Sequence, residues 1–261
     1  MSVPDGSVDR LYPLWDKGES DHRIVVIGVG GLGAAAAVEL AASGIARLGL
    51  VDGDCVELSN LHRQLLHGPS DVGRPKAQVA AEKLRALFPR VRLEARVERF
   101  TIRNAEEILD GFDVAIDATD NTAAKFAIND ACVERGLPFV HAGVTGWSGQ
   151  VLTIVPRQTA CLRCLFPEPP DDDEVASCTR AGILGPLAAL IGTLEAREAI
   201  ALVAGSEGHR TGRLRTVDAR SLRMREVPLR RSTACPACGP FAPAGRIDRG
   251  KQGHASFKET R

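Results

Sequence analysis

Hydrophobic and polar positions along the 261-residue chain follow two alternating patterns. Short runs rich in β-branched residues predict buried strands, and longer stretches with apolar residues at helical spacing, several closed by glycine or proline, predict helices. The predicted strands are residues 24–30, 48–52, 91–97 and 113–120, with two more around a glycine-rich turn within 139–156. The predicted helices are residues 34–43, 76–88, 105–111, 123–136 and 184–204. This alternation predicts an α/β fold with a mainly parallel, Rossmann-like sheet and helices on both faces.

Two later segments change that picture slightly. Residues 139–156 and 214–229 have the pattern of hairpins, so we expect antiparallel strands to extend the parallel sheet. We divide the chain into an N-terminal arm at 1–22, a single domain at 23–240 and a polar tail at 241–261 that is expected to be flexible. An acidic, proline-rich stretch within the domain, at about 167–182, is expected to be a loop.

Composition and charge exclude several classes of function. Lys+Arg and Asp+Glu both total 33, so the formal net charge is zero. A main partner such as nucleic acid or an anionic membrane would favour an excess of basic residues. The N-terminus has no apolar core, and the apolar stretch at 183–194 is too short and too interrupted to span a bilayer. We therefore expect a cytoplasmic protein.

A glycine motif directly follows the first predicted strand. Gly28-x-Gly30-x-x-Gly33, with Gly31 inside it, lies before the first helix, where glycines permit a tight turn and close approach of backbone N–H groups to phosphates. Asp52 ends the second strand, placed to accept hydrogen bonds from a ribose. The pattern indicates a nucleotide site without deciding between NAD and ATP. The alternative is a tight turn that binds nothing.

Three charged residues favour ATP. Arg63 and Lys76 suit a triphosphate better than an NAD pyrophosphate, because both cations can stabilise a departing pyrophosphate. Asp120 follows the strand at 113–120 and offers the carboxylate that Mg²⁺ prefers beside phosphate oxygens. The alternative reading makes Arg63 and Lys76 solvated surface charges and Asp120 the cap of a helix that starts near Thr122.

The order of these motifs resembles a known family. GVGGLG, D-x-D-x-V-x-x-S-N-L-x-R-Q, VGRPK and DATDN together are similar to the ThiF/MoeB/HesA family of bacterial relatives of ubiquitin-activating enzymes, over about residues 24–239. The resemblance implies that the four glycines and Asp52 bind the nucleotide. It also implies cofactor-binding roles at the downstream motifs, with phosphates near Asn60, Arg63, Gln64 and Lys76, magnesium on Asp120, and Asp54 and Asn121 alongside.

The resemblance also implies a reaction. Such enzymes use ATP to adenylate the C-terminal glycine carboxylate of a small ubiquitin-like sulfur-carrier protein, in preparation for sulfur transfer. They are typically homodimers whose N-terminal arm completes the partner's ATP site with an arginine. Here the usual Arg-Gln pair is missing, and Arg10 is the nearest substitute. The family resemblance also implies that the loop at about 167–182 is a crossover loop. Only a short tail follows Gly239, so the sulfur donor is expected in trans. Alternatives from other classes are an NAD-dependent oxidoreductase and a non-catalytic adaptor for a ubiquitin-like protein.

The cysteines point to a metal. Two of the seven cysteines form Cys161-x-x-Cys164, and two more form Cys235-x-x-Cys238. Four thiolates suit tetrahedral zinc in a closed structural site. A redox CxxC or a pair of disulfides is the alternative, but neither explains two such motifs together.

Cys178 lies on the polar loop after the first pair. Arg180 and the start of the next helix would lower its thiol pKa and favour a nucleophile, whereas the aspartates at 171–173 would raise it. We treat Cys178 as a candidate nucleophile for the step after adenylation, against the alternative of an incidental exposed cysteine. Cys55 and Cys132 are expected to be small buried hydrophobes.

Overall fold

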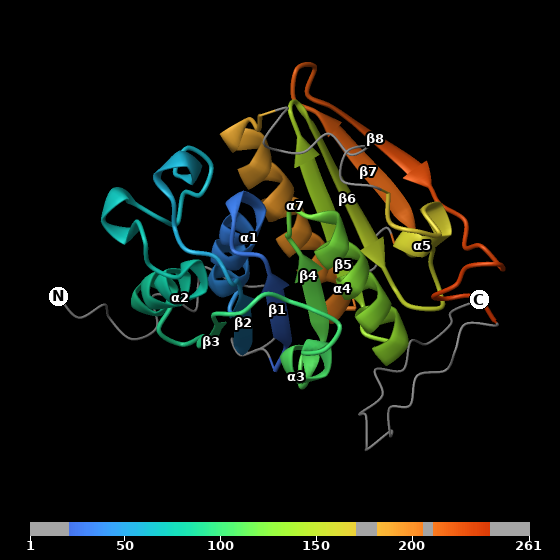
Figure 1. Ribbon diagram of the computed structural model, residues 1–261, viewed down its shortest axis with the longest axis horizontal. Coiled ribbons are helices and arrows are strands. Elements are labelled where there is room, and N and C mark those ends of the chain that lie inside the picture. The colour runs from blue at the N-terminus through green and yellow to red at the C-terminus, as the bar shows by residue number, and fades with distance from the viewer. Residues whose placement is uncertain (1–20, 171–181, 206–210, 241–261) are drawn as a thin grey trace.

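The computed structural model describes residues 21–170, 182–205 and 211–240. Within these ranges eight strands form one sheet in the order β3-β2-β1-β4-β5-β6-β7-β8 (Figure 1). The five strands from β3 to β5 run parallel, and β6, β7 and β8 continue the sheet antiparallel. The strands are β1 (Arg23–Ile27), β2 (Arg47–Val51), β3 (Arg92–Arg96), β4 (Val114–Asp117), β5 (Phe139–Thr145), β6 (Ser148–Ile154), β7 (Arg213–Asp218) and β8 (Arg223–Pro228). The predicted fold class, with its antiparallel extension, is confirmed.

Helices cover both faces of the sheet, with α7 on one side and α4 on the other (Figure 1). Helices α1 and α2 share the core on the α7 side of the sheet, and α3 and α5 share the core on the α4 side. Their bounds are α1 (Gly31–Ala42), α2 (Lys76–Leu87), α3 (Ala105–Leu109), α4 (Thr122–Arg135), α5 (Leu162–Leu165) and α7 (Gly185–Val203), with short 3-10 turns η1 (Leu58–Asn60) and η2 (Pro69–Asp71).

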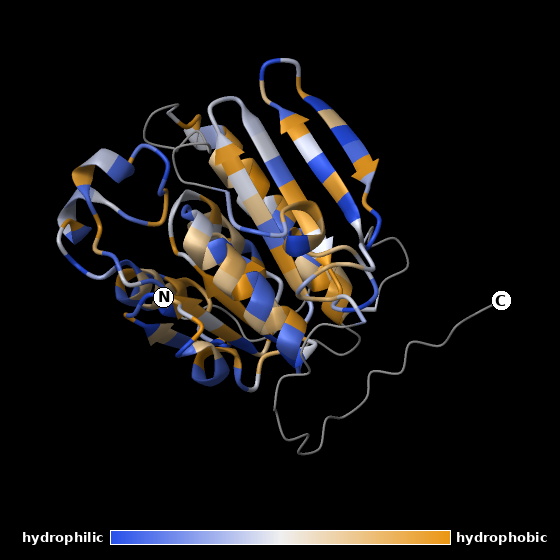
Figure 2. Cartoon of the chain, turned by 45° about the vertical axis from the view of Figure 1, so that its right-hand side comes forward, coloured by the Kyte–Doolittle hydropathy of each residue, from blue (hydrophilic) through white to orange (hydrophobic). Residues whose placement is uncertain are grey.

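Alternate residues of β1 point into two separate cores. Ile24 and Val26 belong to the core under α1 and α7, whereas Val25 and Ile27 belong to the core under α3 and α4. Both faces of the strand are therefore buried, which explains why its sequence is a continuous apolar run rather than an alternation of apolar and polar residues. Figure 2 shows the same uniform hydrophobicity in the central strands and a blue and orange alternation in β7 and β8.

Helices α1 and α7 pack closely because small residues line their contact. A Cβ at Gly192 would lie 2.2 Å from the carbonyl oxygen of Leu32 and 3.1 Å from the Cβ of Ala35. The 2.2 Å distance is shorter than any tolerable contact, so the two helices can approach this closely only with glycine at position 192. The alanine-rich sequence of α1 serves the same contact.

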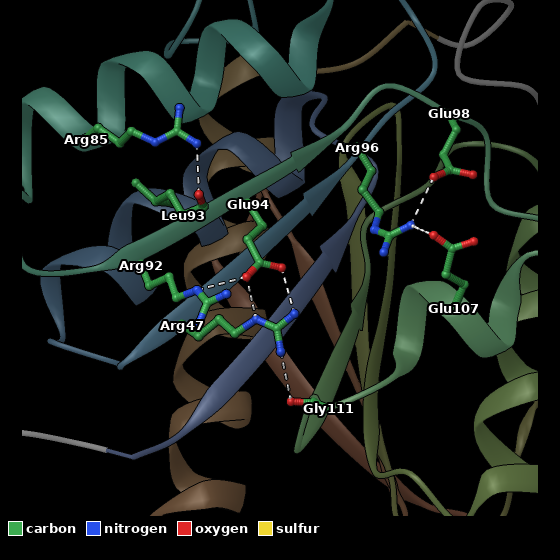
Figure 3. A network of polar contacts seen from close by, with 9 residues as sticks. All are labelled: Arg47, Arg85, Arg92, Leu93, Glu94, Arg96, Glu98, Glu107 and Gly111. Carbon is green, nitrogen blue, oxygen red and sulfur yellow. Dashed lines mark hydrogen bonds and ion pairs between the residues drawn. The ribbon is translucent and has the colours of Figure 1, made fainter.

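Charged side chains line the β3 edge of the sheet (Figure 3). Arg47 donates to both carboxylate oxygens of Glu94, at 2.9 and 2.6 Å, and its guanidinium lies 4.3 Å from the centre of the Phe112 ring. Arg96 donates to Glu107 at 2.6 Å. Charged residues on an edge strand discourage pairing with another chain. None of these residues belongs to the predicted site, and we assign the network a structural role.

Element boundaries differ from the predictions mainly at the sheet edge that carries the site. The strand predicted at 24–30 ends at Ile27 and the one predicted at 113–120 ends at Asp117. The helix predicted at 34–43 begins earlier, at Gly31. The glycine and aspartate residues lie in turns because they leave the sheet at the ends of parallel strands. In the described part of the chain no helix has both the length and the apolarity needed to cross a membrane.

Candidate functional site

The glycine turn between β1 and α1 has a backbone that other residues would not adopt. Gly28 has φ +90°, and a Cβ there would lie 2.7 Å from the carbonyl oxygen of Ala118. At Gly33 a Cβ would lie 1.8 Å from the carbonyl oxygen of Gly28. At Gly30, by contrast, the nearest heavy atom would be 3.7 Å away, on the Gln64 side chain. The turn is thus tightly packed at Gly28 and Gly33 and open at Gly30, at the N-terminus of α1. Backbone N–H groups at a helix N-terminus favour an anion.

Asp52 lies at the carboxyl end of β2, next to this turn. Its Oδ2 accepts a hydrogen bond from the Val29 backbone N–H at 2.7 Å, and its Oδ1 accepts one from the Asp54 N–H at 2.8 Å. Burial raises the pKa of Asp52, and the positive charge of Lys76 offsets part of that rise. The carboxylate predicted to bind a ribose therefore also fixes the shape of the glycine turn.

Lys76, the first residue of α2, is buried rather than solvated. Its side chain is only 10% exposed, and its Nζ lies 3.4 Å from Oδ2 of Asp54. Arg99 donates to the other oxygen of Asp54 at 2.9 Å. Burial opposes ionisation of Asp54, but these two cations outweigh it and lower its pKa. The alternative that Lys76 is an ordinary solvated charge is wrong.

Arg63 and Gln64 lie on the other side of the glycine turn. A Cβ at Gly31 would be 3.3 Å from the backbone oxygen of Arg63 and 3.4 Å from its Cγ, so the Arg63 stem lies against the turn. The Arg63 guanidinium donates to Oδ1 of Asn60 at 2.7 Å. Gln64 is buried, and its Oε1 has no hydrogen-bond partner among the described residues. A buried amide oxygen without a partner is costly, so a hydrogen-bond donor of a bound ligand would suit this position.

His67 is a residue of this edge that the sequence did not single out. It is buried, its Nε2 lies 3.3 Å from the carbonyl oxygen of Val29, and its Nδ1 has no partner in the described ranges. Burial lowers its pKa, so the ring is neutral and Nε2–H donates to the turn. The apolar pattern gave no signal for it, because the contact joins residues 38 positions apart.

The DATDN segment reaches the same edge from β4. Asp120 is exposed, and no side chain in the described part of the chain is hydrogen-bonded to its carboxylate. Asn121 is the N-cap of α4, and its Oδ1 accepts from the Ala124 N–H at 2.8 Å. The alternative in which Asp120 caps this helix is therefore wrong, since the neighbouring asparagine does so. Asp120 is left with a free carboxylate beside the glycine turn.

A buried polar cluster lies directly beneath Asp120. Asp117 is fully buried and accepts from the Thr119 hydroxyl at 2.6 Å and from Nδ1 of His141 at 2.7 Å, while Nζ of Lys125 lies 3.6 Å away. Burial alone would raise the pKa of Asp117, but Lys125 and His141 outweigh it and lower the pKa to about 2. Burial and Lys125 together lower the pKa of His141, so that ring is neutral. Asp117 and Thr119 belong to the DATDN motif, whereas no sequence motif marked Lys125 or His141.

Four cysteines meet at the far side of the α4 face. The Sγ atoms of Cys161 and Cys235 lie 3.6 Å apart, those of Cys164 and Cys238 lie 3.4 Å apart, and all four lie within 4.8 Å of one another. Tetrahedral zinc with bonds of about 2.3 Å implies sulfur separations of about 3.8 Å. None of the four is in a disulfide. The cluster has the size and donor set of a four-thiolate metal site, and the predicted set of ligands is brought together.

Comparison with known proteins supports the motif analysis. The model of the ThiF family matches residues 17–237. A relative from Thermus thermophilus, named sulfur carrier protein adenylyltransferase, is 43% identical over 83% of this chain and 82% of its own length. The chain belongs to the ThiF family. A second relative, the sulfur carrier protein ThiS adenylyltransferase of Escherichia coli, is 40% identical over 84% of this chain and 86% of its own length.

Solved structures agree with the fold of the family. Escherichia coli MccB with ATP superposes with a TM-score of 0.73 at 22% identity, over 84% of this chain and 67% of that one. At this identity the likeness concerns the fold alone. The predicted family and the predicted class of enzyme, an adenylyltransferase that uses ATP, are confirmed by the family model and the named relatives.

Some family positions lie beyond the reach of the structure. Cys178 and Arg10 are outside the described residues, so their predicted roles stay predictions. Cys132 is fully buried, as expected, and its burial raises its pKa. The prediction for Cys55 was wrong: it is exposed, because it lies in the loop after β2 rather than in the strand.

Proposed function

We propose that this chain uses ATP to adenylate the C-terminal glycine carboxylate of a small ubiquitin-like sulfur-carrier protein. The observation that carries the proposal is the composition of one sheet edge. The Arg63 stem packs against the open glycine turn, and Lys76 acts on the Asp52 carboxylate that binds this turn. The exposed Asp120 follows the 118–119 backbone, which packs against Gly28. A nucleoside triphosphate and its metal ion need two cations and a carboxylate beside a glycine turn, whereas a nicotinamide cofactor does not.

The adenylation step does not need a strong general base. The attacking carboxylate is already ionised near pH 7, so one of its oxygens can displace pyrophosphate from the α-phosphorus of ATP. The N–H groups at the start of α1 bind phosphate oxygens, and Arg63 and Lys76 stabilise the charge that develops on the leaving pyrophosphate. The two relatives described above are named as adenylyltransferases of sulfur carrier proteins, which supports the same acceptor here.

Magnesium would be held at Asp120. The exposed carboxylate suits Mg²⁺, which prefers one or two carboxylates together with phosphate oxygens and water. When bound, Mg²⁺ would neutralise negative charge on the phosphates of ATP. The contribution of this chain is to hold that carboxylate at a fixed distance from the glycine turn.

The cysteine cluster supports zinc as a second, structural cofactor. All four Sγ atoms lie within 4.8 Å of one another, and three of the four cysteines are buried. Such a closed site has no open position for substrate, so its role is to tie the segment after β8 to α5. The free thiols also fit the reducing cytoplasm that we propose as its location.

A homodimer is part of the proposal. Leu58 and Leu65 flank Arg63 and are 71% and 78% exposed. Apolar surface of this kind next to a polar site suits a contact with a second protein. In the proposed dimer the N-terminal arm of one chain completes the site of the other.

The test is exchange of labelled pyrophosphate into ATP with a purified carrier that ends in Gly-Gly. The proposal predicts exchange that depends on the carrier and on divalent metal. An adaptor without catalysis would bind the carrier without exchange, and an oxidoreductase would instead change nicotinamide absorbance. Either of those outcomes would overturn the proposal.

A further inference from the structure

Both oxygens of the buried Asp117 carboxylate accept hydrogen bonds. Its Oδ1 accepts from the backbone N–H of Thr119 at 3.2 Å and from the Thr119 hydroxyl at 2.6 Å. Its Oδ2 accepts from Nδ1 of His141 on β5 at 2.7 Å, and Nζ of Lys125 on α4 lies 3.6 Å from the same oxygen. A fully buried charge with this many partners holds them in one arrangement.

The same cluster fixes the turn that carries Asp120. Thr119 is the residue directly before Asp120, and both its backbone and its hydroxyl are bound to Asp117. The residue before it, Ala118, donates its N–H to the carbonyl oxygen of Ile27 at 2.9 Å. Its own carbonyl lies against Gly28, where a Cβ would be 2.7 Å away. The 118–120 turn is therefore clamped between the buried cluster and the glycine turn.

Lys125 ties the cluster to the next strand. Its Nζ donates to the carbonyl oxygen of Ala142 on β5 at 2.7 Å while facing Asp117. The ends of β4 and β5 and the first turn of α4 are thus joined through one carboxylate. Asp117 and His141 are buried and Lys125 is mostly buried, and all three make contacts within the protein at the edge where the phosphates are proposed to bind.

We propose that Thr119 and Asp117 are positioning residues for the reaction, setting the place of the Asp120 carboxylate relative to the glycine turn. The inference rests on the proposed function, which gives Asp120 its role at the metal–phosphate group. Thr119 acts as the link, because its hydroxyl is the only side-chain group of the 118–120 turn bound to Asp117 among the described residues. Displacing a catalytic group by about 1 Å can cost on the order of 10²-fold in rate.

The test compares two substitutions at Thr119 with a matched control. Thr119→Val removes the hydroxyl at constant shape, and Thr119→Ser retains it. Thr101→Val is the control, because the Thr101 hydroxyl also donates to a side chain of a turn, Asn104 at 2.9 Å, away from the site. The readouts are Mn²⁺ affinity in the presence of a non-hydrolysable ATP analogue, the Mg²⁺ concentration for half-maximal exchange, and the midpoint of thermal unfolding.

We expect Thr119→Val to weaken Mn²⁺ binding and raise the half-saturating Mg²⁺ concentration roughly 10-fold, the size expected from losing one such hydrogen bond. Thr119→Ser should stay close to the parent, and Thr101→Val should change neither quantity. If Thr119→Val does not fold, Thr119→Ala carries the same comparison.

A lowered unfolding midpoint for Thr119→Val with unchanged metal dependence would show a merely structural threonine and overturn the inference. The proposed function fails in a different way. If Asp120→Ala has parental exchange, the role of Asp120 is wrong, whereas exchange that needs Asp120 but not the Thr119 hydroxyl overturns only the positioning.

Discussion

The glycine-turn edge and the cysteine cluster treat their polar groups in opposite ways. At the glycine turn polar groups are left available: among the described residues the Asp120 carboxylate and Oε1 of Gln64 have no hydrogen-bond partner. In the cysteine cluster, four sulfurs face one another within 4.8 Å and nothing is left for a ligand other than a metal. The first arrangement suits a site that binds and releases, and the second suits a site that stays closed.

The two regions also lie in different halves of the sheet. The glycine turn is built on the carboxyl ends of the parallel strands β1, β2 and β4, beside the point where the strand order reverses between β1 and β4. The cysteine cluster joins α5 to the segment after β8, at the end of the antiparallel half. Substitutions in the first region should therefore affect chemistry more than folding, and those in the second folding more than chemistry.

The largest expected effect is the loss of stability when the cysteine cluster is disrupted. Cys235→Ser should lower the free energy of unfolding by about 4 kcal/mol or more and abolish the bound zinc, because a structural metal contributes directly to folding. Elemental analysis and urea unfolding measure both quantities. Cys55→Ser, at an exposed free cysteine, is the matched control and should keep both parental values. Freshly purified parent protein without zinc would contradict the zinc assignment.

The next largest effect is on the reaction. Asp120→Ala, Arg63→Ala and Lys76→Ala should each reduce carrier-dependent pyrophosphate exchange by about 10²-fold, the cost of one preorganised charge contact. Their unfolding free energies should change much less. Glu134→Ala, at an exposed carboxylate near the opposite end of α4, is the control and should leave exchange intact. Parental exchange in Asp120→Ala would contradict the assignment of that residue.

Ionisation of the buried Asp117 should make the unfolding free energy depend on pH. Its pKa is lowered to about 2, below the value of about 3.9 in an unfolded chain. The folded state therefore binds fewer protons in this interval, so the stability from Asp117 is complete above about pH 4 and is lost as the pH falls towards 2. Asp117→Asn should lower the unfolding free energy at pH 7 by on the order of 2 kcal/mol, and the difference from the parent should shrink in acid. Urea unfolding at pH 7, 4 and 3 measures it; a difference that is constant with pH would count against an ionised Asp117.

Glu195 on α7 is the opposite case and gives the smallest expected effect. It is fully buried, neither carboxylate oxygen has a hydrogen-bond partner in the described ranges, and burial followed by the charge of Asp117 raises its pKa well above the usual value. The unfolded chain releases this proton earlier, so stability falls as the pH rises above about 4.3. Glu195→Gln should therefore gain about 0.5–2 kcal/mol at pH 7, the range of single stabilising substitutions, and little at pH 4. A variant that is less stable at pH 7 would show that Glu195 is ionised and paired.

Much of this architecture could be predicted from sequence because its signals are local. The strands, the glycine turn and the two CxxC pairs each depend on residues a few positions apart, and all were placed correctly to within a few residues. The motif order also predicted that Asp52, Arg63 and Lys76 meet at one sheet edge. Their individual roles in binding the nucleotide stay predictions.

What the sequence did not reveal depends on contacts between distant segments. His67 meets Val29, and Asp117 meets His141, only after the parallel strands align, and neither histidine follows a recognisable spacing. The sequence left open the alternative that Lys76 is a solvated surface charge, and only the structure shows it buried next to Asp54. The sequence offered Asp120 as a cap for α4, and only the structure shows that the adjacent Asn121 supplies it.

The central claim is that a carrier carboxylate attacks the α-phosphorus of ATP, and the fate of an oxygen atom tests it most directly. The carrier is prepared with ¹⁸O in its C-terminal carboxylate and incubated with enzyme, ATP and a thiol acceptor, and the released AMP is analysed by mass spectrometry. Attack by the carboxylate places one carrier oxygen in the bridge of the adenylate, and that oxygen leaves with AMP when the acyl carbon is attacked. The account predicts AMP that carries one ¹⁸O. AMP without label, formed at the same rate with and without carrier, would contradict it.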